Sequence, residues 1–262
     1  LLKGGHVPGP DVEDLLATPD GVISIRSPRI ETRHTHGTGC TLASAIACGV
    51  AQGMTLEAPC EVFRVREGWY FVDAVDPSRS GRSHSFVLDL MGHRAIHVEV
   101  QAPAPDVPSG LLERIARRGH QSAVDLQITQ GCWNGQAPIF APTTALLGNH
   151  YRYRYSDTHV YDHIYLSERY YCWFCHQGPD AGVGDFEECS YLALAPDLFL
   201  VCWKEKLIPC VGITLEDLRT MRSVGKIFGV DAYTGETGNR TVGAAMSLVS
   251  TFDRPRGGAH VG

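Results

Sequence analysis

Tyr151-Arg152-Tyr153-Arg154-Tyr155 alternates aromatic and basic side chains, and His159-Val160-Tyr161-Asp162-His163-Ile164-Tyr165 continues the alternation after a short turn. Residues two apart share one face of a strand, so this stretch predicts a β-hairpin with an aromatic face. Further candidate strands follow closely, at 169–176, 189–194, 198–205, 208–216, 222–228 and 241–251. Eight strands with hairpin-length loops predict an up-and-down antiparallel barrel, because closure leaves no exposed edge.

Upstream of this region the period of two is also present. Strands are predicted at 62–65, 69–75, 85–90, 96–100 and 124–129, and a short helix at 111–118. Proline-rich stretches at 103–108 and 138–142 read as linkers.

Residues 1–56 differ in kind. A strand at Val22–Arg26 is followed by the glycine-rich Thr35–Cys40 and then by an alanine-rich helix pattern that ends near Gly53. We expect a short α/β segment at 1–56, a partial barrel at 57–140 and a complete barrel at 141–262.

Two stretches in the first half of the chain resemble two stretches in the second half. Val65–Val72 aligns with Leu194–Val201, and Phe86–Leu90 aligns with Thr214–Leu218, with spacings that agree to within one residue. This echo favours a tandem duplication. The first copy lacks β-rich sequence before its hairpin, so its barrel is expected to be incomplete and to offer open strand edges for homo-oligomerisation.

Composition narrows the class of protein. The net charge is -6 and no run of Lys or Arg occurs, which argues against a nucleic-acid partner. No apolar run reaches membrane-spanning length and no signal-peptide pattern opens the chain, so a cytoplasmic protein without a membrane partner is expected. Nine cysteines without framework spacing favour free thiols.

The aromatic face of the second barrel is the candidate site. A ligand chamber needs apolar walls and a few convergent polar groups, which Tyr and His both supply. The ligand-binding candidates are Tyr153, Tyr155, His159, Tyr161, Trp173, Cys175 and Trp203. The opposite arrangement, an aliphatic core with the His/Tyr face in water, stays open.

Glu205 follows Trp203 on the same face, while Lys204 and Lys206 are expected in water. A buried Glu needs a partner, for which His159 or His163 is a candidate, and Glu205, His163 and Tyr165 could together transfer protons. Cys172 and Cys175 have a C-x-x-C spacing, but residues three apart on a strand face opposite sides. No metal and no cofactor are therefore expected.

The chain from Val62 to Phe252 resembles the MoaF family. The resemblance is carried by Val65–Asp73, Val75–Pro77, Tyr153–Ser156, His159–Leu166, Tyr171–Cys175 and Gly225–Lys226. It implies a mainly β, lipocalin-like (calycin) architecture in two parts, and the family name suggests a link to molybdenum cofactor biosynthesis.

Residues 1–55 resemble the C-terminal end of hydroxymethylpyrimidine/phosphomethylpyrimidine kinases. Lys3–His6 and Thr35–Leu42 carry this resemblance. It implies that Cys40 takes the catalytic-base position and that the amides of Gly37, Thr38, Gly39 and Cys40 form an anion hole at a helix N-terminus. Most of such a kinase is absent, so this segment is expected to be vestigial.

Three functions follow from these observations. The first is a carrier or binding protein for a small molecule in the second barrel. The second is an acid/base enzyme, a lyase or isomerase, that uses the same chamber. The third is a truncated, inactive kinase of thiamine biosynthesis.

Overall fold

The structure is a computed structural model that describes residues 11–18, 21–28, 60–75, 81–103, 122–132, 139–231 and 234–253. The chain divides into two compact units, Leu1–Glu57 and Ala58–Gly262. In the first unit, strands β1 (Asp11–Thr18) and β2 (Gly21–Pro28) pair antiparallel. β2 contains the strand predicted at 22–26. β1 was not predicted, because its acidic residues have low strand propensity. The predicted glycine-rich turn and helix lie outside the described residues.

The second unit begins with an open antiparallel sheet of five strands in the order β3-β4-β5-β6-β7. All five strands were predicted. The helix predicted at 111–118 lies outside the described residues. The strands are β3 (Cys60–Arg66), β4 (Trp69–Val75), β5 (Arg82–Asp89), β6 (Arg94–Gln101) and β7 (Asp125–Cys132).

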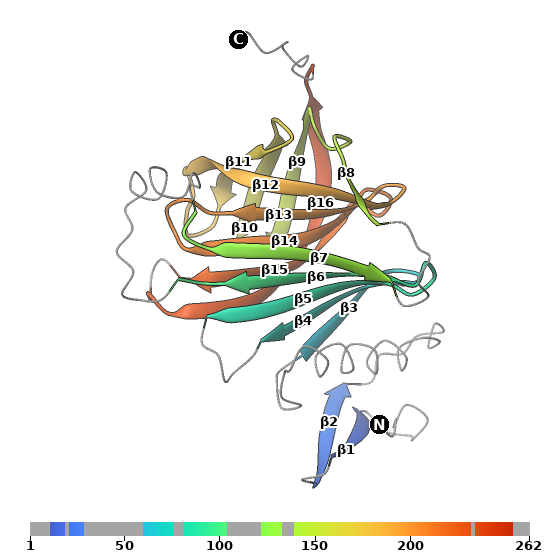
Figure 1. The fold of residues 1–262 in the computed structure, drawn as a ribbon. Helices are drawn as coiled ribbons and strands as arrows, with labels where there is room; N and C mark the ends of the chain where they lie inside the picture. Colours follow the sequence, from blue (N-terminus) through green and yellow to red (C-terminus); the bar gives the residue numbers. More distant parts are fainter. Residues whose placement is uncertain are drawn as a thin grey trace. The chain divides into compact units, whose positions relative to one another are not determined.

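A closed antiparallel barrel of eight strands follows, as the alternation predicted (Figure 1). Pairing of β11 with β12 and of β9 with β16 closes it. A two-residue strand, β8 (Ala141–Pro142), pairs with β12 inside the stretch predicted as a linker. The barrel strands are β9 (Asn149–Ser156), β10 (His159–Tyr165), β11 (Tyr170–Gln177), β12 (Gly184–Ala195), β13 (Leu198–Lys204), β14 (Cys210–Asp217), β15 (Arg222–Val230) and β16 (Thr237–Thr251).

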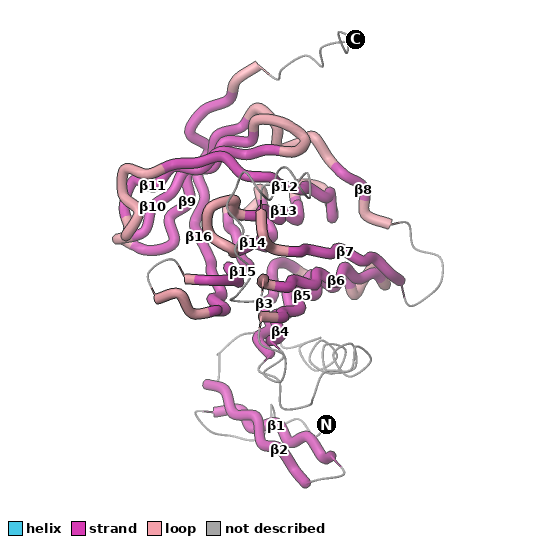
Figure 2. The backbone as a smooth tube through the Cα atoms, turned by 60° about the vertical axis from the view of Figure 1, so that its left-hand side comes forward, coloured by secondary structure: helices cyan, strands magenta, loops and turns pink. Residues whose placement is uncertain are grey.

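The main aliphatic core lies outside the barrel, between its wall and the five-stranded sheet. Leu200, Ile213 and Leu215 on the barrel wall cluster with Phe71 and Val98 of the sheet, and all are buried. Each such side chain contributes about 1.5–3 kcal/mol when it leaves water. Strands β9, β10 and β11 lie on the side of the barrel away from this sheet (Figure 2). The barrel interior is therefore a second core, separate from the aliphatic one, and it contains different side chains.

The two halves that resemble each other in sequence also share features of backbone geometry. The β3–β4 and β12–β13 hairpins both have a register shift near the turn, between Arg64 and Arg66 and between Ala193 and Ala195. Gly68 and Asp197 occupy the same turn position and both have a positive φ. His93 and Met221 match in the same way in the next hairpins, with φ of 55° and 50°.

The five-stranded sheet therefore corresponds to strands β12 to β16 of the barrel. Counterparts of β9, β10 and β11 do not occur among the described residues before β3. The first barrel is open for that reason, as expected from the sequence. No helix long and apolar enough to cross a bilayer occurs among the described residues.

Candidate functional site

The aromatic face of the barrel strands points into the barrel. Tyr153, Tyr165 and Tyr171 are almost fully buried and cluster with Val201 and Trp203 from the opposite wall. The alternating side chains of β13 and β14 divide between two cores. Phe199, Val201 and Trp203 face the interior, whereas Leu198, Leu200 and Cys202 face the five-stranded sheet. Of the two arrangements left open by the sequence, the structure has the aromatic interior.

His163 lies at the centre of the aromatic cluster. Its ring centroid is 4.1 Å from that of Tyr153, 5.2 Å from Tyr171 and 5.7 Å from Trp203. Burial lowers the pKa of His163 to about 3, so the imidazole is neutral at physiological pH. The hydroxyls of Tyr153 and Tyr165 share a hydrogen bond of 2.7 Å.

The remaining ligand-binding candidates lie toward one end of the barrel. Tyr155, Tyr161 and Trp173 are half-buried there, and Cys175 is buried beside them. The Tyr161 hydroxyl donates to Asp180 in the loop between β11 and β12, at 3.3 Å. His159 is different, because it is exposed and its Nδ1 contacts the hydroxyls of the neighbouring turn.

Glu205 has a different partner from the one expected. Its Oε1 accepts a 2.8 Å hydrogen bond from the Trp203 indole, and its carboxyl lies close to that of Glu187. Among the described residues, Glu205 makes no hydrogen bond or ion pair with His159 or His163, the two partners that were predicted for it. Lys206, expected in water, is largely buried and forms an ion pair with Asp185.

The two carboxyls share a site that disfavours ionisation. Burial, followed by the proximity of Glu205, raises the pKa of Glu187 to about 9. Burial also raises the pKa of Glu205. Like charges in one low-dielectric site cannot both ionise, so the pair holds at least one proton at neutral pH.

Glu216 is a functional candidate that the sequence reasoning missed. It is completely buried in the barrel interior, where its Oε1 accepts hydrogen bonds from Thr214 at 2.7 Å and Ser223 at 3.3 Å. Burial raises the pKa of this carboxyl to about 7, against the effect of those bonds and of the nearby Tyr153 hydroxyl. The alternation of Thr214 and Glu216 with Ile213 and Leu215 was the available signal.

Several interior polar atoms have no hydrogen-bond partner. They are buried and come from four strands: His163 Nδ1, Trp173 Nε1, Tyr191 OH and Glu216 Oε2. Most buried polar atoms in folded proteins are satisfied, because an unpaired one costs about 1–3 kcal/mol. The concentration of unpaired atoms in one aromatic interior marks that interior as the candidate site.

Asp162 lies on the outer face of the barrel and does not belong to this interior. Its carboxylate accepts from both Arg152 Nε at 2.8 Å and His176 Nε2 at 2.7 Å, with His150 Nε2 at 2.8 Å. Its burial is thus explained by a local ion-pair network.

The strongest potential metal ligands among the described residues are elsewhere. His84, His97 and Glu99 lie on one face of β5 and β6, with ligand atoms within 4.8 Å of one another. His84 Nδ1 and His97 Nε2 are 2.9 Å apart, which already fits a direct hydrogen bond. Cys172 and Cys175 are free thiols, of which Cys175 is buried and Cys172 is half-buried.

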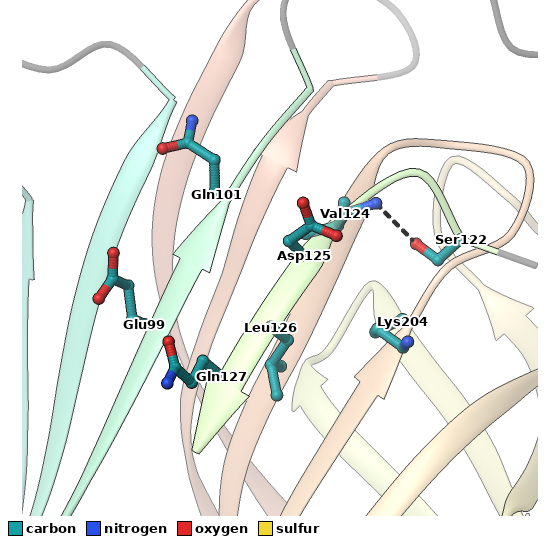
Figure 3. Close-up of a pocket in the computed structure, with 8 residues that line it drawn as sticks. All are labelled: Glu99, Gln101, Ser122, Val124, Asp125, Leu126, Gln127 and Lys204. Atoms are coloured by element: carbon teal, nitrogen blue, oxygen red, sulfur yellow. Dashed lines mark hydrogen bonds between the residues drawn. The ribbon is translucent and has the colours of Figure 1, made fainter. Parts of the chain in front are cut away.

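A surface pocket of about 250 Å³ lies at the edge of the five-stranded sheet (Figure 3). None of the predicted site residues lines it, and its wall is mainly amide and carboxylate side chains of β6 and β7 together with Lys204. The lining residues are Glu99, Gln101, Ser122, Val124, Asp125, Leu126, Gln127 and Lys204. Most polar side chains of this pocket are half-buried or exposed, whereas those of the barrel interior are buried, so the barrel interior is the stronger candidate.

Comparison with known proteins yields two separate likenesses. Residues 140–252 match the model of the MoaF C-terminal domain. The protein MoaF of Klebsiella aerogenes is 35% identical over 195 residues, which cover 74% of each chain.

Residues 1–62 match the model of phosphomethylpyrimidine kinase. The hydroxymethylpyrimidine/phosphomethylpyrimidine kinases of Streptomyces coelicolor and Rhizobium meliloti are 55% and 50% identical over 56 residues. Those residues are 21% of this chain and 20% and 21% of the two kinases. The chain thus spans about a fifth of the length of these kinases. The motif residues Gly37, Thr38, Gly39 and Cys40 lie outside the described residues.

Proposed function

Since the chain belongs to the MoaF family, we propose that its complete barrel is a binding chamber for a small organic molecule. The chamber is the aromatic interior around His163, and Tyr155, Tyr161 and Trp173 line its half-buried end. A ligand there would stack on the aromatic rings and satisfy the unpaired polar atoms.

The observation that carries this proposal is the set of unsatisfied interior polar atoms. The two halves of the chain supply an internal comparison. In the five-stranded sheet, the positions that correspond to Thr214 and Glu216 are Phe86 and Leu88, and both are buried. The same strand arrangement therefore forms with apolar side chains at these positions. The polar groups of the barrel interior are not required by the fold, which favours a role in binding.

A binding experiment tests the proposal. Purified protein is screened by thermal shift and by tryptophan fluorescence against a panel of aromatic amines, aromatic acids and pterins. The pterins test the link to molybdenum cofactor biosynthesis that the family name suggests. A ligand of the chamber should raise Tm and change the emission of Trp173 and Trp203.

Substitution of a chamber residue separates interior from surface binding. His163→Phe keeps a flat ring at the centre but removes both ring nitrogens, so it should weaken binding about tenfold or more through one lost hydrogen bond. His159→Phe, at an exposed position, is the matched control and should bind as the wild type does. Equal binding by both variants would place the ligand elsewhere and contradict the proposal.

Acid/base catalysis is the second candidate, and one observation favours it. The carboxyls of Glu187 and Glu205 lie close together and both have raised pKa values, and Glu205 accepts a hydrogen bond from Trp203. A carboxyl that stays protonated at neutral pH can act as a general acid. Turnover of a bound ligand that disappears in Glu205→Gln, with binding retained, would support an enzyme. Loss of affinity alone would support a binding protein.

A further inference from the structure

We infer that the barrel interior recognises a positively charged nitrogen, an amine or ammonium group held by Glu216 within a cage of tyrosine rings. This inference rests on the proposed binding function and names the chemical class of the ligand. The ligand would have a compact cationic head and an aromatic or apolar body.

The cage is formed by side chains of β9 and β10 around the carboxyl from β14. Burial raises the pKa of Tyr151, Tyr153, Tyr155 and Tyr165, and the ionised Glu216 raises it further, so all four phenols lie within the electrostatic reach of this carboxylate. The rings also contact one another. Tyr153 and Tyr155 are stacked with centroids 6.3 Å apart, and Tyr151 meets Tyr165 edge-on at 6.2 Å.

One carboxylate oxygen of Glu216 is available. Thr214 and Ser223 both donate to Oε1, whereas Oε2 is buried without a hydrogen bond of good geometry. A charged donor on the ligand would meet this oxygen in a desolvated site, where charge-assisted hydrogen bonds are strongest.

The electrostatics of the interior favour a cation. Arg240 shares the β16 face of Ala244 and Met246, but it is exposed and pairs with Asp231, and Lys226 points outward to Asp73. The faces of aromatic rings carry negative charge, and recognition of ammonium groups by aromatic cages exploits this property. An anionic ligand beside Glu216 would meet its carboxyl group, and Lys206, the cation next to Glu187, is already paired with Asp185.

Protonation of Glu216 provides a specific signature. Its pKa of about 7 leaves it partly protonated at neutral pH, and a cation would bind the ionised form. Affinity for a permanently charged ligand should therefore rise about tenfold between pH 6 and pH 8. The other titratable groups around this carboxyl are Tyr151, Tyr153 and Tyr155 on β9, His163 and Tyr165 on β10, and Cys189 and Tyr191 on β12.

These neighbours do not titrate in the same range. Burial raises the pKa of the five tyrosines above 10 and that of Cys189 above its usual value. Burial lowers the pKa of His163 to about 3. A transition near pH 7 in ligand affinity would thus report on Glu216.

The test compares probes that differ in charge. Benzylammonium, benzyltrimethylammonium, benzyl alcohol and benzoate are titrated into the full chain by calorimetry at pH 6, 7 and 8. We expect at least one of the two cations to bind tenfold or more tightly than the alcohol, and benzoate to bind weakest. For benzyltrimethylammonium, which cannot lose a proton, the affinity should rise with pH.

Glu216→Gln keeps the shape of the side chain and removes its charge. It should abolish the preference for the cation over the alcohol and also the pH dependence. Glu188→Gln is the matched control, because Glu188 is a buried carboxylate on the outer face that pairs with Lys204. This control should leave both effects unchanged.

The outcomes separate the two proposals. Failure of every probe, and of the wider panel, would overturn the binding function itself. Binding of the alcohol or benzoate as tightly as the cations, or an unchanged preference in Glu216→Gln, would overturn only the cation inference. Should Glu216→Gln fail to fold, Glu216→Leu, which copies Leu88 of the first sheet, replaces it. The pH dependence of benzyltrimethylammonium affinity in the wild-type protein tests the cation inference without any variant.

Discussion

At the scale of single residues, Asp162 and His163 show how one step along a strand changes the chemistry. They are neighbours on β10, and both are buried. Hydrogen bonds from Arg152, His176 and His150 hold the pKa of Asp162 well below its usual range, although burial alone would raise it. His163 faces the interior, where burial keeps it neutral. The charged group is therefore satisfied outside and the neutral one is unpaired inside.

The Asp162 network makes stability depend on pH. Because its pKa is lowered in the folded state, its stabilisation is complete above the unfolded pKa of about 3.9 and is lost as the pH falls below it. Asp162→Asn should lower the free energy of unfolding by about 1.5–3 kcal/mol at pH 7, since hydrogen bonds to a charged group are lost. The difference from wild type should shrink by pH 3. Urea denaturation at both pH values measures it.

Asp157→Asn is the control for this prediction, because Asp157 is exposed in the β9–β10 turn. It should change stability by less than about 0.5 kcal/mol at either pH. A loss in Asp162→Asn that is the same at pH 3 as at pH 7 would mean that charge is not the cause.

At the scale of elements, the β13–β14 pair shows how a glycine positions an aromatic side chain. Gly212 lies directly opposite Trp203, and a Cβ on Gly212 would come within 2.0 Å of the indole. The indole therefore lies flat over the glycine, and its Nε1 reaches Glu205. The close approach orients one wall of the barrel interior.

Gly212→Ala should displace the Trp203 ring and break its hydrogen bond to Glu205. We expect a loss of about 1–3 kcal/mol in the free energy of unfolding, as for other overpacked cores. A change in tryptophan emission should accompany it. Gly238→Ala in β16 is the matched control, because a Cβ there would meet nothing within 4 Å. Equal stability of the two variants would contradict this account of the wall.

At the scale of the whole second unit, a buried ion pair joins the barrel to the five-stranded sheet. Lys226 of β15 is completely buried and contacts Asp73 of β4 and Ser83 of β5. Asn239 of β16 donates to the same aspartate. Because the surrounding aliphatic core keeps water away from both charges, Lys226 and Asp73 each depend on the other for compensation.

Lys226→Met should therefore cost about 3–5 kcal/mol of unfolding free energy, because it leaves a buried aspartate uncompensated. The double variant Lys226→Met/Asp73→Leu removes both charges and should recover most of that loss. Chemical denaturation of the single and double variants measures the coupling. An equal or larger loss in the double variant would show that the pair is not coupled.

The sequence alone determined every strand of the two sheets in the second unit except β8, and with them the closed barrel and the incomplete first copy. Period-two alternation and hairpin turns are local properties, and Val65–Val72 and Leu194–Val201 repeat them in both halves. The aromatic set on β9 and β10 was also visible, because residues two apart must share a face.

Only the tertiary structure decided which face is inside and which polar groups meet there. Both faces of β13 and β14 are buried, one by the barrel and one by the five-stranded sheet, so hydrophobicity could not rank them. Glu187 lies on β12, Glu216 lies on β14, and Glu205 directly follows β13. Their placement and their pKa values depend on closure of the barrel, since closure removes the water that would otherwise solvate them.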